Sequence, residues 1–305
     1  MIFLSIFIIT LVLVIMGFYF VRNYAFKNII LGKRKSKEDA FNILTKRNVY
    51  NIKEYDNLNF EDLYINSLDG YKLKGYFLNN FENSKKLIII VHGYTANHFI
   101  ALQFMDMFLK EKFNVLLIDT RSHGESEGKN VTYGLRERED LHLWVNFMKK
   151  KLGNDITIGL HGQSMGAATV LMYGGKYDDV DFIIEDCGYS NGKELLRYQF
   201  KKTAKFPLYP LYFLVNNLIK RKCNFSMNDV SPIDDIKNKE IPTLFIHGTG
   251  DKLIPYTMSE EMFNCKIGNK NKLFLVENAA HVEAYAKDKE GYEKVVREFI
   301  NSIKQ

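Results

Sequence analysis

The residues most able to carry out chemistry form a Gly-x-Ser-x-Gly motif, in which Gly162 and Gly166 flank Ser164. The motif follows an apolar, strand-like segment at 156–160 and precedes a run of small, helix-compatible residues at 167–171. This strand–turn–helix setting predicts a nucleophile elbow, a sharp and strained turn that exposes a serine hydroxyl. Glycine is needed on both sides of the serine because a Cβ there would collide with the adjoining strand or helix. The motif therefore predicts a serine nucleophile for acyl transfer.

Two further residues complete the set that such a serine requires, since a neutral hydroxyl needs a positioned base and the base needs an acid to orient it. Asp251 follows the strand-like segment 243–246 through a glycine-rich turn, and His281 follows the segment 273–276. Each lies on a loop after a strand, so both are expected at the same edge of the sheet as Ser164. The chain order serine, acid, histidine is one of the known orders of such triads. The sequence thus predicts a triad of Ser164, Asp251 and His281.

Other residues compete for these roles. Asp186, which follows the strand-like segment 182–184, is the alternative acid, but proline-containing dipeptides frame the Asp251 loop toward the histidine. The polar loop 119–128 is interpreted as support for a neighbouring turn rather than as catalytic machinery. The remaining histidines lack the placement of His281, and the one directly before the elbow is expected to be packed or hydrogen-bonded within its strand. These histidines are His98, His123, His142, His161 and His247.

Acyl transfer also needs hydrogen-bond donors for the oxyanion that develops on the substrate carbonyl. The backbone N–H of Met165, directly after the nucleophile, is expected to be one donor. The second is expected from the turn after the apolar segment 87–91, where His92 and Gly93 support the backbone N–H of Tyr94. Gly93 allows close approach of the backbone, and the Tyr94 hydroxyl either assists the oxyanion or packs beneath a lid expected at 190–235.

These residues need a scaffold, and the rest of the chain predicts a mostly parallel sheet with helices on both faces. Continuous apolar runs such as 87–91 and 115–118 are typical of strands that are buried on both faces. A turn at 68–71 predicts an antiparallel hairpin at the opening edge of the sheet. The expected strands are 63–65, 73–77, 87–91, 115–118, 156–160, 182–184, 243–246 and 273–276, and the expected helices are 99–113, 135–152, the segment after Ser164, 256–266 and 289–303. This alternation predicts an α/β catalytic domain over residues 56–305.

Residues 190–235 interrupt the alternation and indicate two or three inserted helices. The insertion lies near the carboxyl ends of the strands, where ligands bind in open α/β sheets. Its aromatic and proline-containing run at 206–211 suits a lid over an apolar pocket. The alternative is that these helices extend the core.

The N-terminal 19 residues from 2 to 20 are apolar apart from two hydroxyl residues and one glycine. As a helix such a run rises roughly 28 Å, which is enough to cross the hydrocarbon core of a bilayer. We predict a single-pass transmembrane anchor at 1–21 and a charged helical connector at 22–55. A cleaved signal peptide is disfavoured because no basic residue precedes the run and no small-x-small site follows it. A buried core helix is the other alternative.

Basic residues cluster directly after the predicted span: Arg22, Lys27, Lys33, Arg34, Lys35 and Lys37. The positive-inside rule then places the catalytic domain in the cytoplasm, with the extracytoplasmic side as the alternative. Beyond residue 50 positive and negative residues are interspersed, so the net charge of +6 argues for a solvated surface and against nucleic-acid binding. The three cysteines have no paired spacing, which argues against a disulfide framework and a zinc site.

Taken together, His92-Gly93, the 119–128 loop, the Gly162–Gly166 motif, Asp251 and His281 resemble the bacterial α/β-hydrolase family. The resemblance covers about residues 50–303. The chain especially resembles membrane-anchored, uncharacterised hydrolases of Gram-positive bacteria, which are grouped with the serine aminopeptidase-like and prolyl-oligopeptidase-like hydrolases. It implies an α/β-hydrolase fold with a helical lid and a Ser-His-Asp esterase, lipase, thioesterase or peptidase that uses no cofactor or metal.

The predicted reaction is cleavage of a lipophilic carboxylic ester or thioester, because an aromatic insertion and a membrane anchor favour an acyl chain over a polar peptide. A peptidase or an acyltransferase would use the same residues. A catalytically idle, membrane-tethered binding domain is the alternative from another class. Dehalogenases and epoxide hydrolases are disfavoured because they use aspartate at the position of Ser164.

Overall fold

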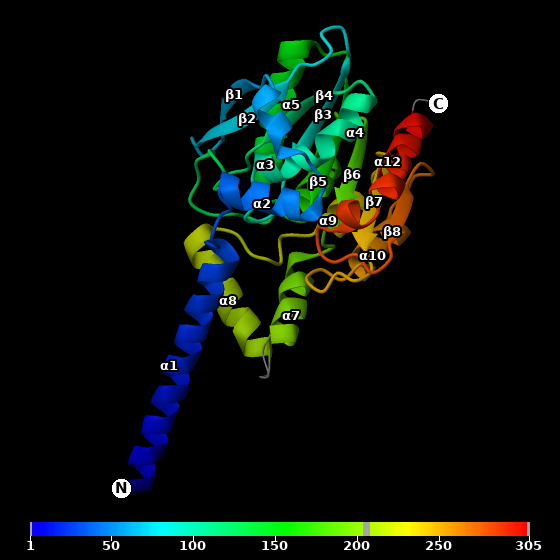
Figure 1. Cartoon of the computed structure of the whole chain (residues 1–305). Coiled ribbons are helices and arrows are strands. Elements are labelled where there is room, and N and C mark those ends of the chain that lie inside the picture. Colours follow the sequence, from blue (N-terminus) through cyan, green and yellow to red (C-terminus); the bar gives the residue numbers. More distant parts are fainter. Residues whose placement is uncertain (1, 204–207, 304–305) are drawn as a thin grey trace.

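The computed structural model describes residues 2–203 and 208–303. Its centre is an eight-stranded sheet with the strand order β1-β2-β4-β3-β5-β6-β7-β8 (Figure 1). The strands are β1 (Glu61–Asn66), β2 (Lys72–Leu78), β3 (Lys86–Val91), β4 (Asn114–Ile118), β5 (Thr157–Gln163), β6 (Phe182–Asp186), β7 (Thr243–Gly248) and β8 (Lys272–Val276). The pairs β1–β2 and β2–β4 are antiparallel, and the remaining pairs are parallel. The predicted parallel sheet with an antiparallel hairpin at one edge is confirmed.

Helices cover both faces of this sheet. They are α3 (His98–Ala101), α4 (Met105–Lys110), α5 (Glu137–Leu152), α6 (Met165–Lys176), α9 (Pro232–Ile236), α10 (Thr257–Cys265), α11 (Ala284–Lys287) and α12 (Lys289–Ile303), with a 3₁₀ turn at Leu102–Phe104. The expected helix at 99–113 is therefore broken into α3, the 3₁₀ turn and α4. Within the turn the buried Gln103 amide donates to the carbonyl of Ile100.

The central strand β3 shows why both faces are covered. Ile88 and Ile90 belong to an apolar cluster with residues of α4, α11 and α12, whereas Leu87, Ile89 and Val91 belong to a second cluster with residues of α5, α6 and α10. All five side chains are buried. Because successive strand residues point to opposite faces, a continuous apolar run requires a helix layer on each side.

The N-terminal helix α1 (Ile2–Ile30) projects away from the sheet domain (Figure 1). It is long and apolar enough to cross a membrane, and none of its most apolar 18-residue window is buried in the structure. Its last turns behave differently, because Phe26 and Ile30 are buried against α8 (Leu208–Cys223). The helix continues past residue 21 as one piece, so its final turns belong to the packed part of the molecule.

The segment between α1 and the sheet also folds onto the domain. It contains α2 (Lys37–Arg47) and a 3₁₀ helix at Ile52–Asn57. Ser36 and Asp39 form a capping box at the start of α2, and Asn48 ends the helix in the left-handed conformation. These local signals fix where α2 begins and ends, and Leu44 packs into the core.

The insertion at 190–235 contains α7 (Gly192–Thr203), α8 and the start of α9. Phe206 and Pro207 of its aromatic run lie outside the described residues. Side chains of α7 and α8 form an apolar cluster with the end of α1 and with Met165 and Tyr189. In Figure 1 both helices extend from the same end of the domain as α1.

Candidate active site

The predicted nucleophile stands at the junction of β5 and α6. Ser164 has φ 57° and ψ −115°, a conformation that is strained for a residue with a side chain. Its N–H donates to the carbonyl of Asp186 on the neighbouring strand at 2.7 Å. A Cβ at Gly162 would lie 2.3 Å from the carbonyl oxygen of Gly166, and one at Gly166 would lie 2.1 Å from that of Val91. Only glycine fits at both positions, as the sequence motif predicts.

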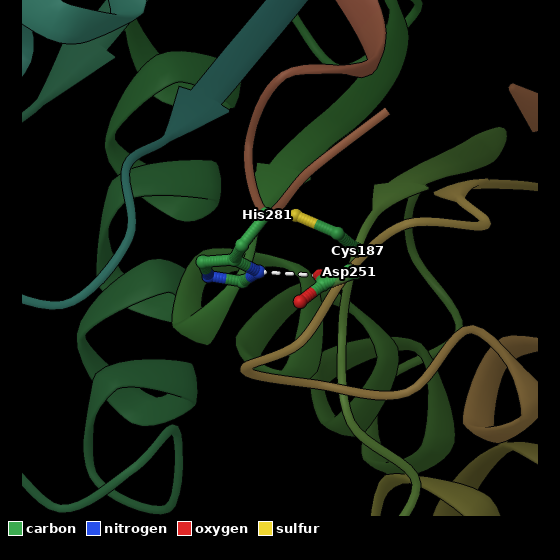
Figure 2. Close-up of side chains that lie close together, drawn as sticks. All are labelled: Cys187, Asp251 and His281. Atoms are coloured by element: carbon green, nitrogen blue, oxygen red, sulfur yellow. Dashed lines mark hydrogen bonds and ion pairs between the residues drawn. The ribbon is translucent and has the colours of Figure 1, made fainter. Parts of the chain in front are cut away.

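The structure brings the three predicted triad residues into one hydrogen-bonded line. Ser164 Oγ lies 2.9 Å from Nε2 of His281, and Nδ1 of His281 lies 2.6 Å from Oδ2 of Asp251. Figure 2 shows the second contact, with the imidazole of His281 turned toward the carboxylate. Because Nδ1 donates to the carboxylate, Nε2 of a neutral imidazole is left to accept the serine proton.

The Asp251 carboxylate is completely buried and is held by its own loop. Its Oδ1 accepts hydrogen bonds from the backbone N–H groups of Leu253 and Ile254 at 2.8 and 2.9 Å. Burial alone would raise the pKa of Asp251, but hydrogen bonds from His247 and His281 outweigh it and hold the pKa far below its usual range. The group is therefore an ionised acceptor at neutral pH.

His247 was not expected to have a site role, and the structure corrects this. Its Nε2 lies 3.2 Å from Oδ2 of Asp251, and its Nδ1 lies 2.7 Å from Oγ of Ser259. The Ser259 hydroxyl in turn donates to the carboxylate of Glu185. Burial raises the pKa of Glu185 to about 7. The signal in the sequence was the position of His247, four residues before Asp251 at the end of a strand.

Asp186, the alternative acid, takes a different position. Its Oδ2 accepts from the amide of Gln163 at 2.9 Å and lies 3.4 Å from the hydroxyl of Tyr292. Asp251, rather than Asp186, contacts His281. The Gln163 side chain thus ties the elbow to the end of β6.

The expected oxyanion donors lie on two sides of the nucleophile. The N–H of Met165 is in the first turn of α6, where backbone donors have no partner within the helix. A Cβ on Gly93 would lie 3.1 Å from Cβ of Ser164, so the turn after β3 passes directly beside the nucleophile. This close approach leaves the N–H of Tyr94, the next residue, as the candidate second donor.

His92 and the loop at 119–128 hold this turn. The N–H of Thr120 donates to Nε2 of His92 at 3.1 Å, so Nδ1 carries the proton and donates to the carbonyl of Gly93 at 2.8 Å. Burial lowers the pKa of His92 to about 4, which keeps the ring neutral. Nε2 of His123 accepts from the N–H of Thr95 at 3.0 Å. These contacts agree with the interpretation of the loop as support for the oxyanion turn.

The Tyr94 hydroxyl forms its hydrogen bonds with backbone groups near the end of α1. It donates to the carbonyl of Asn28 at 2.6 Å and accepts from the N–H of Gly32 at 2.9 Å. The candidate oxyanion turn is therefore hydrogen-bonded to the end of α1 and the residues that follow it.

A cavity of about 300 Å³ opens beside Ser164 and His281. Among the described residues that line it, none belongs to the insertion at 190–235. The described residues of the predicted lid thus do not line this cavity, and several of their apolar side chains pack in the cluster with the end of α1. The connector supplies part of the wall instead, through Lys35, Ile43 and Arg47.

The other histidines lie away from the nucleophile. His161 is buried in β5, its Nε2 lies 2.9 Å from the hydroxyl of Tyr292, and burial lowers its pKa to about 3. Nδ1 of His98 faces the carboxylate of Asp119, and His142 stacks on Tyr177. The packed role expected for His161 is what the structure shows.

One group of side chains near the nucleophile has the types found in metal sites. Potential ligand atoms of Cys187, Asp251 and His281 lie within 4.8 Å of one another (Figure 2). Burial raises the pKa of the Cys187 thiol well above its usual value, whereas a metal ligand must be a thiolate. The Nδ1 of His281 is already engaged by Asp251 at 2.6 Å. The arrangement suits a triad better than a metal centre.

Comparisons with known proteins point to a family of hydrolases. Residues 82–192 match the model of the family described as serine aminopeptidase, S33. The chain is 34% identical over 277 residues to YqkD of Bacillus subtilis (strain 168), described as an uncharacterized protein, and the alignment covers 90% of each chain. It is 26% identical over 198 residues to the putative esterase YitV of the same organism, covering 61% of this chain and 76% of YitV.

Solved structures share the fold. The esterase Pf2001 of Pyrococcus furiosus superimposes with a TM-score of 0.67 at 24% sequence identity, over 83% of this chain and 96% of that one. Est1E of Butyrivibrio proteoclasticus, solved with bound ferulic acid, has a TM-score of 0.61 at 22% identity, over 79% of this chain and 98% of that one.

Proposed function

Because this chain belongs to the α/β-hydrolase family of enzymes, we propose that it is a serine esterase that cleaves lipophilic carboxylic esters or thioesters. The observation that carries the proposal is the continuous hydrogen-bonded line from Ser164 Oγ through His281 to Asp251, with distances of 2.9 and 2.6 Å. A serine at a strained elbow, a base within reach and a buried ionised acid are the parts that nucleophilic acyl transfer needs.

In the proposed mechanism His281 removes the proton of Ser164 as Oγ attacks the substrate carbonyl. Asp251 orients the imidazole and stabilises the imidazolium that forms. The N–H groups of Met165 and Tyr94 bind the oxyanion, and His281 returns the proton to the leaving alcohol or thiol. Water then attacks the acyl-enzyme with His281 again as base, which releases the acid and restores Ser164.

The cavity supports an acyl group as the part of the substrate next to Ser164. Its wall includes the apolar residues Ile43, Ala96, Ile100, Leu253 and Val282. Its volume of about 300 Å³ is at the small end of ligand pockets, which favours a short acyl group or one end of a longer chain. The description of YitV as a putative esterase is consistent with this class of substrate.

We further propose that α1 anchors the enzyme in a membrane, with the catalytic domain on the cytoplasmic side. Residues 2–21 are exposed and apolar, and basic residues follow them on the side of the domain. Protection of a C-terminal tag from protease in intact spheroplasts tests the side. Cleavage of the tag before lysis would place the domain outside.

The esterase proposal is tested with p-nitrophenyl esters of increasing acyl length and with a fluorophosphonate probe. We expect hydrolysis and labelling in the full chain, and loss of both in Ser164→Ala. Labelling without turnover of any ester would move the function to a peptidase or an acyltransferase with the same triad. A folded chain that neither labels nor turns over would favour a binding domain on a hydrolase scaffold.

A further inference from the structure

The connector supplies two cations to the wall of the catalytic cavity. Lys35 precedes α2 and Arg47 ends it, and both line the cavity that also contains Ser164 and His281. They lie 12 positions apart in the sequence and more than 100 positions before the nucleophile. No motif in the sequence points to them.

Both cations are fixed to loops that carry candidate catalytic groups. The ammonium of Lys35 donates to Oγ1 of Thr95 at 2.9 Å, and the Lys35 N–H donates to the Thr95 carbonyl at 2.8 Å. Thr95 directly follows Tyr94 of the oxyanion turn. Arg47 donates through NH1 to the carbonyl of Val282, next to His281, at 3.0 Å. Each cation is thus held by the residue that follows an active-site residue.

The charge of this pair is not balanced from within the cavity. Among the described residues that line it there is no carboxylate, and Asp251 lies completely buried behind His281. Glu283 pairs with Arg47 at 3.3 Å, but its side chain is 45% exposed and does not line the cavity. Burial, and next the positive charge of Arg47, lower the pKa of Lys35, while Asp39 acts in the opposite direction. Two positive groups therefore line the same cavity and repel each other, and a bound anion would relieve this repulsion.

We propose that the enzyme acts on esters that carry an anionic group, a phosphate or a carboxylate, which Lys35 and Arg47 bind while the ester carbonyl lies at Ser164. Ammonium and guanidinium groups form strong charge-assisted hydrogen bonds with such anions. This inference rests on the proposed esterase function and names its substrate class. An anionic lipid and a soluble anionic ester offer the same chemistry to this pair.

The reaction needs only the ester and water. Ser164 Oγ bonds to the ester carbon, the ester C–O bond breaks, and the alcohol leaves with the proton that His281 holds. Water then cleaves the acyl-enzyme to give a carboxylic acid, which releases its proton to solvent, and restores the serine. The anionic group stays on whichever fragment carried it and takes no part in bond breaking.

The test compares matched neutral and anionic esters on the full chain in detergent. The soluble pair is 1-butyryl glycerol and 1-butyryl glycerol 3-phosphate, and the micellar pair is 1-oleoyl glycerol and 1-oleoyl glycerol 3-phosphate. We expect kcat/KM to favour the anionic member of at least one pair by about tenfold or more. A preference in both pairs assigns a small anionic ester, and a preference confined to the oleoyl pair assigns an anionic lipid.

Variants connect the preference to the two cations. Lys35→Gln and Arg47→Gln should each lower the anionic-to-neutral ratio by about tenfold, and Arg47→Lys should restore part of it. Lys33→Gln and Lys46→Gln, which remove the same charge from exposed positions nearby, are the controls and should leave the ratio unchanged. Fluorophosphonate labelling of each variant shows that the site is folded.

A measurement on the unaltered chain is independent of variant folding. Inorganic phosphate and glycerol 3-phosphate should inhibit hydrolysis of 1-butyryl glycerol competitively, whereas glycerol should not. Equal kcat/KM for neutral and anionic esters in both pairs, with no inhibition by these anions, would overturn the inference while leaving the esterase intact. Absence of all ester turnover and of labelling would instead overturn the proposed function.

Discussion

Nε2 of His247 lies 3.2 Å from Oδ2 of Asp251, the oxygen that also accepts the hydrogen bond from His281. The same nitrogen faces the carbonyl of Ile254 at 3.0 Å, and Nδ1 faces the hydroxyl of Ser259, whose proton goes to Glu185. Both ring nitrogens thus point at acceptors, which suits a doubly protonated ring. Burial acts to lower the pKa of His247, but Asp251 and Glu185 together raise it. The contacts and the raised pKa therefore both favour the protonated form of His247 behind the candidate catalytic acid.

Replacement of His247 by Gln should remove this charge while leaving an amide near Asp251. We expect kcat/KM to fall about tenfold or more, since a hydrogen bond to a charged group contributes roughly 1.5–3 kcal/mol. The pKa of Asp251 should rise toward its usual value of 3.8, so activity should be lost at a higher pH on acidification than in the parent. Ester hydrolysis of both proteins from about pH 2.5 to 9 measures the shift.

The control for this experiment is His161→Gln. His161 is also a fully buried strand histidine, but its hydrogen-bond partner is Tyr292 rather than a triad residue. This variant should lose stability without a change in the shape of the pH profile. An acid limb that stays in place in His247→Gln would show that His247 only fills space.

Glu185 should make the folded state less stable as the pH rises. Burial raises its pKa from 4.5 to about 7, so between these values the folded protein holds a proton that the unfolded chain has released. Stability is then lost as the pH rises from about 4.5 to about 7 and stays at the lower level above that. Glu185→Gln imitates the protonated form and should lack this loss.

Thermal unfolding at pH 5 and pH 8 measures the effect. The variant should gain up to about 3 kcal/mol relative to the parent between the two pH values, the equivalent of the shift in pKa. Glu82→Gln, at an exposed position before β3, controls for the loss of one carboxylate. A difference between Glu185→Gln and its parent that does not grow with pH would contradict the raised pKa.

The sequence predicts the sheet, and which three side chains the fold brings together, because these signals are local. Each parallel strand is a short apolar run, and Ser164, Asp251 and His281 each follow such a run. The wall of the cavity has no local signal, because Lys35 and Arg47 reach it only after α2 folds back over the oxyanion turn. The insertion was expected to cover the pocket, but its described apolar side chains cluster with the end of α1, and composition alone does not determine which neighbour an apolar helix packs against.

The stabilities of two inactive variants of Ser164 should reveal the backbone strain at the nucleophile elbow. Ser164 has φ 57°, so Ser164→Ala keeps a side chain in an unfavourable conformation, whereas Ser164→Gly relieves it. We expect Ser164→Gly to be about 1 kcal/mol more stable than Ser164→Ala, although glycine gains entropy in the unfolded chain. Denaturant unfolding of both proteins gives the comparison. A less stable Ser164→Gly would argue against stored strain at this position.

Tyr94→Phe should slow the reaction because it removes the hydrogen bonds between the oxyanion turn and the end of α1. The substitution removes the hydroxyl that bonds to Asn28 and Gly32 and so loosens the turn that presents the Tyr94 N–H. We expect kcat to fall several-fold with little change in KM, because an oxyanion donor acts mainly in the transition state. Tyr133→Phe is the matched control, since its hydroxyl donates to the carbonyl of Ile29 at 3.0 Å but lies outside the turn. Equal loss of kcat in both variants would point to stability alone.

The boundary between anchor and enzyme should lie inside α1 rather than after it. Side chains from residue 2 to residue 21 are exposed, whereas Phe26 and Ile30 are buried with Val215 and Ile219 of α8. A chain without residues 2–21 should therefore stay folded and hydrolyse soluble esters. A chain without residues 2–36 loses Phe26, Ile30 and Lys35, and loss of the two apolar side chains alone should cost about 5 kcal/mol or more. Since that approaches the whole stability of a typical domain, the shorter chain should unfold or aggregate.

Thermal unfolding and ester hydrolysis of the two truncated chains measure this difference. Phe26→Ala in the longer truncated chain should give an intermediate result. Equal stability and activity of both truncations would show that the connector is a tether and not a part of the active-site wall.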